Sequence, residues 1–320
     1  MALKITGDKL SDTFAFDGEH APTDKAMGGT ELMMKWLRQT IDPDLINQFQ
    51  IIPSRVRELE DKPRILWMHD TADDPEVQHL KDKESLDRFD KIVYVSHWQK
   101  QQFEWFLGIP PSKGIVLKNA IQPFPEHKKP DRGLNVLYSV FDHLCESHDN
   151  IHLDVYSSFK IYGWDHRDLD YKSVFDLLDK HPHITNHGAV SNDKVRVALQ
   201  KAHIFAYPSI WPETSCISLM EAMSARLLCA IPGFAALPET AANHAFMYPW
   251  DENLEVHASM FAGTLDQAIK NYRDENIQFG LDLQKQYADR FYNIDVRAQE
   301  WTGLLTGILA RKDQNALSTE

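Results

Sequence analysis

The sequence is poor in cysteine and in positive charge, and it lacks any long apolar run. Three cysteines in 320 residues are too few for a disulfide framework or a zinc ribbon, and they favour a reducing, cytoplasmic compartment. With 34 basic and 47 acidic residues, the net charge of −13 excludes a chain-wide grip on nucleic-acid phosphates. No apolar run reaches the ~20 residues of a membrane span, so any membrane contact is expected to be peripheral, at the inner face.

Short apolar runs alternate with helical patterns, which is typical of α/β domains with parallel strands. Residues 119–131 contain three prolines without periodicity, so we place the interdomain linker there. This predicts an N-terminal domain over 1–122, a second domain over 123–290, and a segment 291–320 with a helix that can pack back on the first domain and a polar tail. The strands are expected at 64–69, 91–96, 114–118, 151–156 and 202–207.

Residues 207–225 predict a strand, a proline-containing loop and a helix. Glu213 lies in the loop, and Thr214 or Ser215 can cap the helix. In open α/β sheets, ligands bind beyond the carboxyl ends of the strands, where a helix N-terminus offers unpaired N–H groups. A diphosphate fits that position. Glu213 and Glu221 bracket the helix start and could hold two ends of a nucleotide-sugar.

The order and spacing of several motifs make the chain resemble the retaining glycosyltransferases of the GT4 type, also called glycosyl transferases group 1. The signature of that family is a pair of glutamates separated by seven residues, here Glu213 and Glu221. The accompanying motifs are Gly28-Gly29-Thr-Glu-Leu, His69-Asp70, Val95-Ser-His-Trp, Lys118-Asn-Ala-Ile, Asp131-Arg-Gly-Leu and Gly188-Ala-Val-Ser.

The resemblance implies the GT-B architecture, with two Rossmann-like doubly wound domains facing a cleft and a helical C-terminus. It makes residues 1–122 the acceptor-side domain and residues 123–290 the nucleotide-sugar donor domain. It implies a hexosyltransferase that moves a sugar, with retention and without metal or cofactor, from a UDP- or GDP-sugar to a hydroxyl. The acceptor would be a glycan, a lipid-linked molecule or a protein in glycan, lipopolysaccharide or other surface-glycoconjugate synthesis. The implied catalytic residues are Glu213 and His69, and the implied donor-binding residues are Gly28, Gly29, Arg132, Ser215, Cys216, Ile217 and Glu221.

The sequence departs from the family at the start of the donor domain. The family has a first strand that ends in a Gly-Arg pair, whereas residues 127–134 pass from the linker to Asp131-Arg132-Gly133 without an apolar run. We therefore expect this strand to be missing, residues 123–131 to supply no long substitute, and the sheet to be small. Arg132, at the start of the following helix, would be the remaining cation for the diphosphate. Slow turnover, or none, follows for this abbreviated donor domain.

Alternatives remain open at this point. The protein could be a catalytically impaired nucleotide-sugar-binding protein of the same fold, or a sugar-nucleotide epimerase, which would need a second acid and base set. Glu213 could be a solvated loop residue and Glu221 a helix-surface residue. Gly28-Gly29 could be a plain turn, and His69 could be a rim residue. His181, His183 and His187 could bind a metal ion, although no carboxylate or cysteine completes a recognisable ligand spacing. Cys216 could be a thiol with a lowered pKa.

Overall fold

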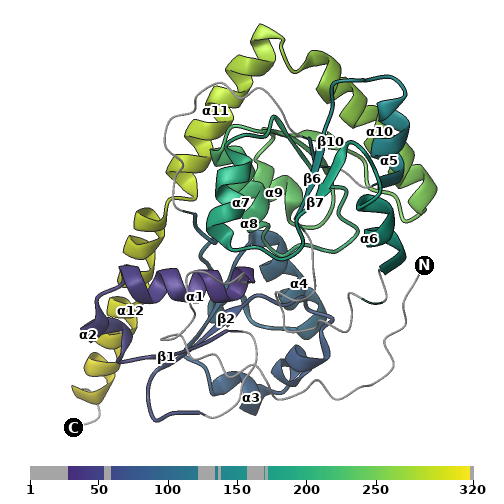
Figure 1. The fold of residues 1–320 in the computed structure, drawn as a ribbon. Helices are drawn as coiled ribbons and strands as arrows, with labels where there is room; N and C mark the ends of the chain where they lie inside the picture. Colours follow the sequence, from purple (N-terminus) through teal and green to yellow (C-terminus); the bar gives the residue numbers. More distant parts are fainter. Residues whose placement is uncertain are drawn as a thin grey trace.

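The computed structural model describes residues 28–53, 59–121, 134–135, 138–156, 169 and 172–317, which form two parallel sheets with helices on both faces (Figure 1). The N-terminal lobe contains the sheet β1-β2-β3-β4. Its strands are β1 (Gln50–Pro53), β2 (Arg64–Met68), β3 (Lys91–Tyr94) and β4 (Gly114–Val116). Its helices are α1 (Gly29–Thr40), α2 (Pro43–Ile46), α3 (Lys83–Asp87), α4 (His97–Leu107) and the 3-10 turns η1 (Pro75–Lys81) and η2 (Pro111–Lys113).

The C-terminal lobe contains the sheet β10-β9-β8-β5-β6-β7, also parallel throughout. Its strands are β5 (Leu134–Asn135), β6 (Leu153–Val155), β7 (Ile184–Asn186), β8 (Ile204–Ala206), β9 (Leu228–Pro232) and β10 (Phe246–Tyr248). Its helices are α5 (Tyr138–Cys145), α6 (Lys172–Leu178), α7 (Asn192–Leu199), α8 (Ile217–Ser224), α9 (Leu237–Ala241), α10 (Leu254–Asn271) and α11 (Glu275–Phe291). A last helix, α12 (Ile294–Leu317), follows.

The strand sequences explain why each sheet is covered on both faces. In β2, Ile65 and Trp67 pack toward α1 and α12, whereas Leu66 and Met68 pack toward α4 and η1. Because neighbouring side chains of a strand point to opposite faces, a continuous apolar run needs cover on both sides. The five strands expected from such runs are confirmed as β2, β3, β4, β6 and β8, each shorter than its run.

The strand expected to be missing from the donor sheet is present. Strand β5 lies between β8 and β6, with Leu134 paired to both Ile204 and Leu153. The expectation that this strand is missing is therefore wrong, because two residues of β5 suffice to join the two halves into one continuous sheet. Arg132 precedes this strand, and the next helix, α5, begins only at Tyr138, so Arg132 does not start that helix. Residues 122–133, including Arg132 and the whole segment 123–131 expected to hold no strand, lie outside the described residues.

Helix α12 returns along the N-terminal lobe, where Figure 1 shows it in yellow beside α1 and α2. Its buried residues Trp301, Leu305 and Ile308 belong to the same apolar cluster as the core of α1. The chain passes between the lobes at Ile121, which forms an isolated parallel bridge with Asn293. The Ile121 amide donates to the Tyr292 carbonyl at 2.6 Å. None of the described helices is long and apolar enough to cross a bilayer.

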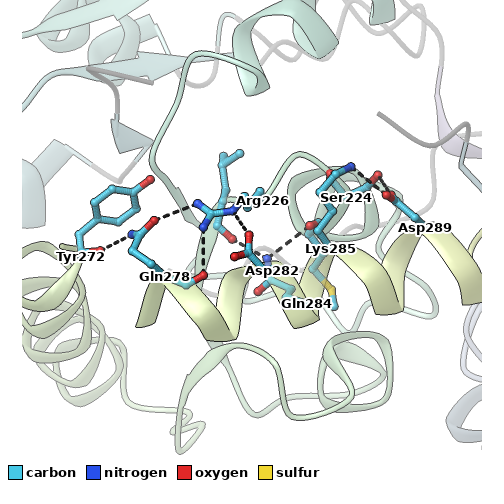
Figure 2. A network of polar contacts seen from close by, with 10 residues as sticks. Ser224, Arg226, Tyr272, Gln278, Asp282, Gln284, Lys285 and Asp289 are labelled. Carbon is cyan, nitrogen blue, oxygen red and sulfur yellow. Dashed lines mark hydrogen bonds and ion pairs between the residues drawn. The ribbon is translucent and has the colours of Figure 1, made fainter. Parts of the chain in front are cut away.

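A polar network fixes the end of α8 to α11 (Figure 2). Arg226 donates to Asp282 Oδ1 at 2.5 Å, to Gln278 Oε1 at 2.9 Å and to the Gln278 carbonyl at 3.0 Å. Lys285 donates to the Ser224 carbonyl at 2.9 Å and to Asp289 at 2.8 Å. The network therefore holds the helix that carries Glu221 against the outer layer of the lobe.

We expect Arg226→Ala to lower the free energy of unfolding by roughly 1–3 kcal/mol, because three hydrogen bonds of a largely shielded guanidinium are lost. Arg226 has a left-handed backbone with φ of 66°, a conformation that costs a residue with a Cβ about 1 kcal/mol. Arg226→Gly should therefore be less destabilising than Arg226→Ala in urea unfolding. Arg290→Ala, on the exposed side of α11, is the control, and equal stabilities of all variants would contradict the prediction.

Candidate functional site

The N-termini of α1 and α8, from different lobes, meet at the proposed donor site. A Cβ on Gly29, the first residue of α1, would lie 3.0 Å from Ile217 Cδ1, at the start of α8. The cap residues are Gly28 and Cys216, and neither helix has a side-chain cap. Two helix N-termini side by side present N–H groups and positive dipole ends to the same place. This arrangement suits an anion such as a diphosphate.

The loop before α8 is bound to the end of β2. The Thr214 hydroxyl donates to the His69 carbonyl at 2.9 Å. Thr214 thus forms a hydrogen bond between the two lobes and does not cap α8. The cap of α8 is Cys216 rather than the predicted Thr214 or Ser215. The buried Ser215 hydroxyl makes no hydrogen bond within the described part of the chain.

Glu213 is held on both its main chain and its side chain. Its carbonyl accepts from the Ala236 amide at 3.0 Å, and its carboxylate Oε1 accepts from the Tyr207 hydroxyl at 2.5 Å. Burial raises the pKa of Glu213, and the Tyr207 hydrogen bond opposes that rise. The alternative of a solvated loop residue is therefore wrong for Glu213.

Cys216 is buried at the start of α8, where a helix N-terminus would favour a thiolate. Burial outweighs that effect and, with the nearby charge of Glu213, raises the pKa of the thiol to about 12. The alternative of a lowered pKa at Cys216 is therefore wrong. The residue packs as a small apolar group and contributes its main chain to the helix start.

Glu221 lies in the second turn of α8, with only 5% of its surface exposed. Its Oε1 accepts from Arg196 Nη1 of α7 at 2.8 Å. Burial raises the pKa of Glu221, and the Arg196 charge opposes this. An exposed helix-surface position is excluded, and the ion pair gives the carboxylate a fixed place inside the lobe.

His69 follows β2 at the edge of the sheet, with its ring 4.9 Å from the Trp67 ring. Burial lowers the pKa of His69 to about 3. The imidazole is therefore neutral at physiological pH and offers hydrogen bonds rather than positive charge.

Glu239, at the lobe junction, was not identified from the sequence. Its carboxylate accepts from the amides of His97 and Trp98 at 3.1 Å each and pairs with Lys118 at 3.1 Å. Burial favours its neutral form, but these three partners outweigh burial and hold the pKa below its usual value. Glu239 thus connects α9 of the C-terminal lobe to α4 of the N-terminal lobe.

The structure brings most of the sequence-predicted site residues together at this junction, through the contacts of Gly29 with Ile217 and of Thr214 with His69. Glu221 lies one turn farther into α8, and Arg132 lies outside the described residues. Sequence reasoning missed Tyr207, Arg196 and Glu239. A tyrosine at a strand end is usually interpreted as a core residue. No local spacing in the sequence links Arg196 to Glu221, or Glu239 to α4. Within the described segments, no group of three or more His, Cys, Asp or Glu side chains could hold a metal ion.

The family model described as "Glycosyl transferases group 1" matches residues 109–275. Among curated proteins, the chain is 22% identical over 220 residues to the phosphatidylinositol N-acetylglucosaminyltransferase gpi3 subunit of Schizosaccharomyces pombe, covering 62% of this chain and 45% of that protein. The chain spans less than half the length of the curated relatives it matches, 45% and 37%.

Two solved structures show the fold that the chain shares. A glycosyltransferase from Rickettsia africae superposes with a TM-score of 0.62 at 11% identity, covering 95% of this chain and 84% of that one. Anabaena HepE in complex with UDP-glucose gives a TM-score of 0.61 at 12% identity, covering 77% and 72%. These neighbours have the GT-B architecture, which confirms the fold expected from the sequence.

We expect Glu221→Ala to lower the free energy of unfolding by roughly 1–3 kcal/mol, because it leaves the mostly shielded Arg196 cation without this partner. Arg196→Ala should cost a similar amount. The double variant should lose clearly less than the sum, and urea unfolding of all four proteins measures the coupling. Strict additivity would show that the pair contributes nothing. Glu255→Ala, an exposed acid on α10, is the control.

The lowered pKa of His69 predicts a pH dependence of stability. The unfolded histidine takes up a proton near its ordinary pKa of 6.5, whereas the folded one does so only near 3. Above pH 6.5, His69 therefore does not change the free energy of unfolding with pH. As the pH falls from 6.5 toward 3, proton uptake by the unfolded chain lowers the free energy of unfolding. In this window, His69→Gln should reduce the slope of the free energy of unfolding against pH. The reduction should correspond to at most about one bound proton. An unchanged slope would contradict the burial of the imidazole.

Proposed function

Because the chain belongs to the glycosyl transferases group 1 family, we propose that it transfers a sugar from a nucleotide-sugar donor to a hydroxyl acceptor, with retention at the anomeric carbon. Family membership supports glycosyl transfer in general. The donor, the acceptor and the stereochemistry are our proposal.

The meeting of the α1 and α8 N-termini beside Glu213 is the observation that carries this proposal. Negative charge builds up on the leaving diphosphate as the glycosidic bond breaks. Preorganised N–H groups in a shielded site stabilise that charge without a metal ion. We place the diphosphate against Gly29 and the amides of Ser215, Cys216 and Ile217, with Arg132 as an additional cation.

The buried acids would bind the two ends of the donor. Glu213 accepts hydrogen bonds from hydroxyls of the sugar, and Glu221 takes the ribose while Arg196 keeps its carboxylate in place. A donor phosphate oxygen receives the proton of the acceptor hydroxyl. Neutral His69 positions the sugar or the acceptor by hydrogen bonding, since its low pKa leaves it without positive charge.

We propose UDP as the nucleotide, because HepE was solved with UDP-glucose and the curated relatives are named as N-acetylglucosaminyltransferase subunits. UDP-glucose and UDP-N-acetylglucosamine are therefore the first donors to test. We propose a glycan, lipid-linked or protein acceptor, reached from the cytoplasmic side, where reduced thiols such as the three free cysteines persist. Because β5 is present, the loss of the first donor-domain strand no longer supports the alternative of a binding-only relative.

Addition of UDP should raise the melting temperature by roughly 5 °C at about a hundredfold excess over Kd, because the diphosphate binds only the folded site. Uridine, which lacks phosphate, should shift it far less. Gly29→Asp should abolish the shift, because its side chain would meet Ile217 and place a carboxylate among the helix N-termini. Differential scanning calorimetry measures all three. Unchanged melting at millimolar UDP, GDP and ADP would count decisively against a nucleoside diphosphate site.

A further inference from the structure

Tyr207 is fixed in place where β8 ends. Its amide donates to the Ala230 carbonyl at 3.0 Å, which extends the pairing of β8 with β9. Its ring stacks on Phe205, with centroids 5.4 Å apart and planes 20° from parallel. Cys216, the cap residue of α8, makes a side-chain contact with the phenol. The hydroxyl is therefore aimed at Glu213 by the framework of the lobe.

The Glu213 carboxylate is held at one oxygen only. Oε1 accepts from the Tyr207 hydroxyl, while Oε2 has no hydrogen-bond partner within the described part of the chain. The main chain cannot swing away, because the Glu213 carbonyl is bound to the Ala236 amide at 3.0 Å and its amide to the Trp211 carbonyl at 2.9 Å. A half-buried carboxylate with one oxygen fixed and one unused is prepared to accept a further hydrogen bond.

We infer that Tyr207 is a positioning residue: its hydroxyl fixes Glu213 so that Oε2 accepts a hydrogen bond from a hydroxyl on the donor sugar. This inference rests on the proposed function. It adds Tyr207, which lies outside the two-glutamate motif, to the residues of the proposed donor site. Tyr207 touches neither the nucleotide nor the reacting atoms in this scheme. Its effect is limited to the part of the affinity that the sugar contributes.

The charge state of Glu213 gives this role a distinct signature. The titratable groups that face the carboxylate are Tyr207 from β8 and Cys216 from α8, while α9 contributes the segment with the Ala236 amide. Burial raises the pKa of both the phenol and the thiol, so neither ionises below pH 8. As the pH falls, Glu213 is thus the group among them whose protonation changes, from a pKa that burial raises and the Tyr207 hydrogen bond lowers. Loss of the Tyr207 hydrogen bond removes the influence that lowers its pKa.

The test compares the affinities of the full chain for UDP, UDP-glucose and UDP-N-acetylglucosamine by isothermal titration calorimetry from about pH 5 to pH 8. The ratio of UDP-sugar affinity to UDP affinity isolates the contribution of the sugar. In Tyr207→Phe, this ratio should fall by about tenfold at neutral pH, while UDP affinity stays within about twofold. In both proteins the ratio falls as the pH drops through the Glu213 pKa, and in Tyr207→Phe that fall begins at a higher pH.

Three further variants make the result specific. Tyr292→Phe removes another buried hydroxyl, which donates to the Thr240 carbonyl at 2.7 Å, and should leave the ratio unchanged. Glu213→Gln should lose the pH dependence, and Tyr207→Phe should cause no additional loss in that background. Replacing Tyr207 with 3,5-difluorotyrosine keeps the hydroxyl and makes it a stronger donor, so the fall should move to lower pH even if Tyr207→Phe does not fold.

The outcomes separate this inference from the proposed function. Binding of UDP with a sugar ratio that neither Tyr207 substitution changes at any pH overturns the role of Tyr207 alone. If the wild-type chain binds neither UDP nor either UDP-sugar, the proposed donor site is wrong and the inference falls with it. A loss of UDP affinity in Tyr207→Phe equal to the loss for the UDP-sugars would show a merely structural residue.

Discussion

The carboxylate of Glu239 projects from α9 into the start of α4, and this contact fixes the position of one lobe against the other. An acid at a helix N-terminus satisfies amides that would otherwise lack partners, and Lys118 neutralises its charge. The segment just before Glu239 also supplies the Ala236 amide that holds the Glu213 carbonyl. The same stretch of chain therefore sets both the junction of the lobes and the place of the acid in the proposed donor site.

Local electrostatics decides how an acidic protein can hold an acidic ligand. The net charge of −13 gives no general attraction for a diphosphate. The junction offers main-chain N–H groups at the starts of two helices instead, where the cap residues Gly28 and Cys216 are buried. Such dipoles stabilise an anion at close range and add no net charge, so the overall acidity of the chain and the proposed anion site do not conflict.

The sequence predicted most of the architecture because its strands are continuous apolar runs, which only a sheet covered on both faces can bury. It failed at β5, since a two-residue strand gives no run to detect, although its central place makes it essential to the sheet. The two glutamates were found by their spacing within one segment. Their partners were not, because Arg196 and Tyr207 reach them through packing of α7 and β8, which no local pattern encodes. The cap of α8 was predicted wrongly for a related reason, because Thr214 forms a hydrogen bond with His69 of the other lobe.

The place of α12 also bears on how the molecule is made. Trp301, Leu305 and Ile308 of α12 complete a core whose other members include residues of α1, β2 and β3. A ribosome releases those early segments long before it releases α12. During synthesis, the C-terminal lobe can finish its own sheet while one face of the first lobe stays uncovered and exposes apolar surface to chaperones and to neighbouring chains. The core of the lobe that is translated first therefore needs the helix that is translated last among the described elements.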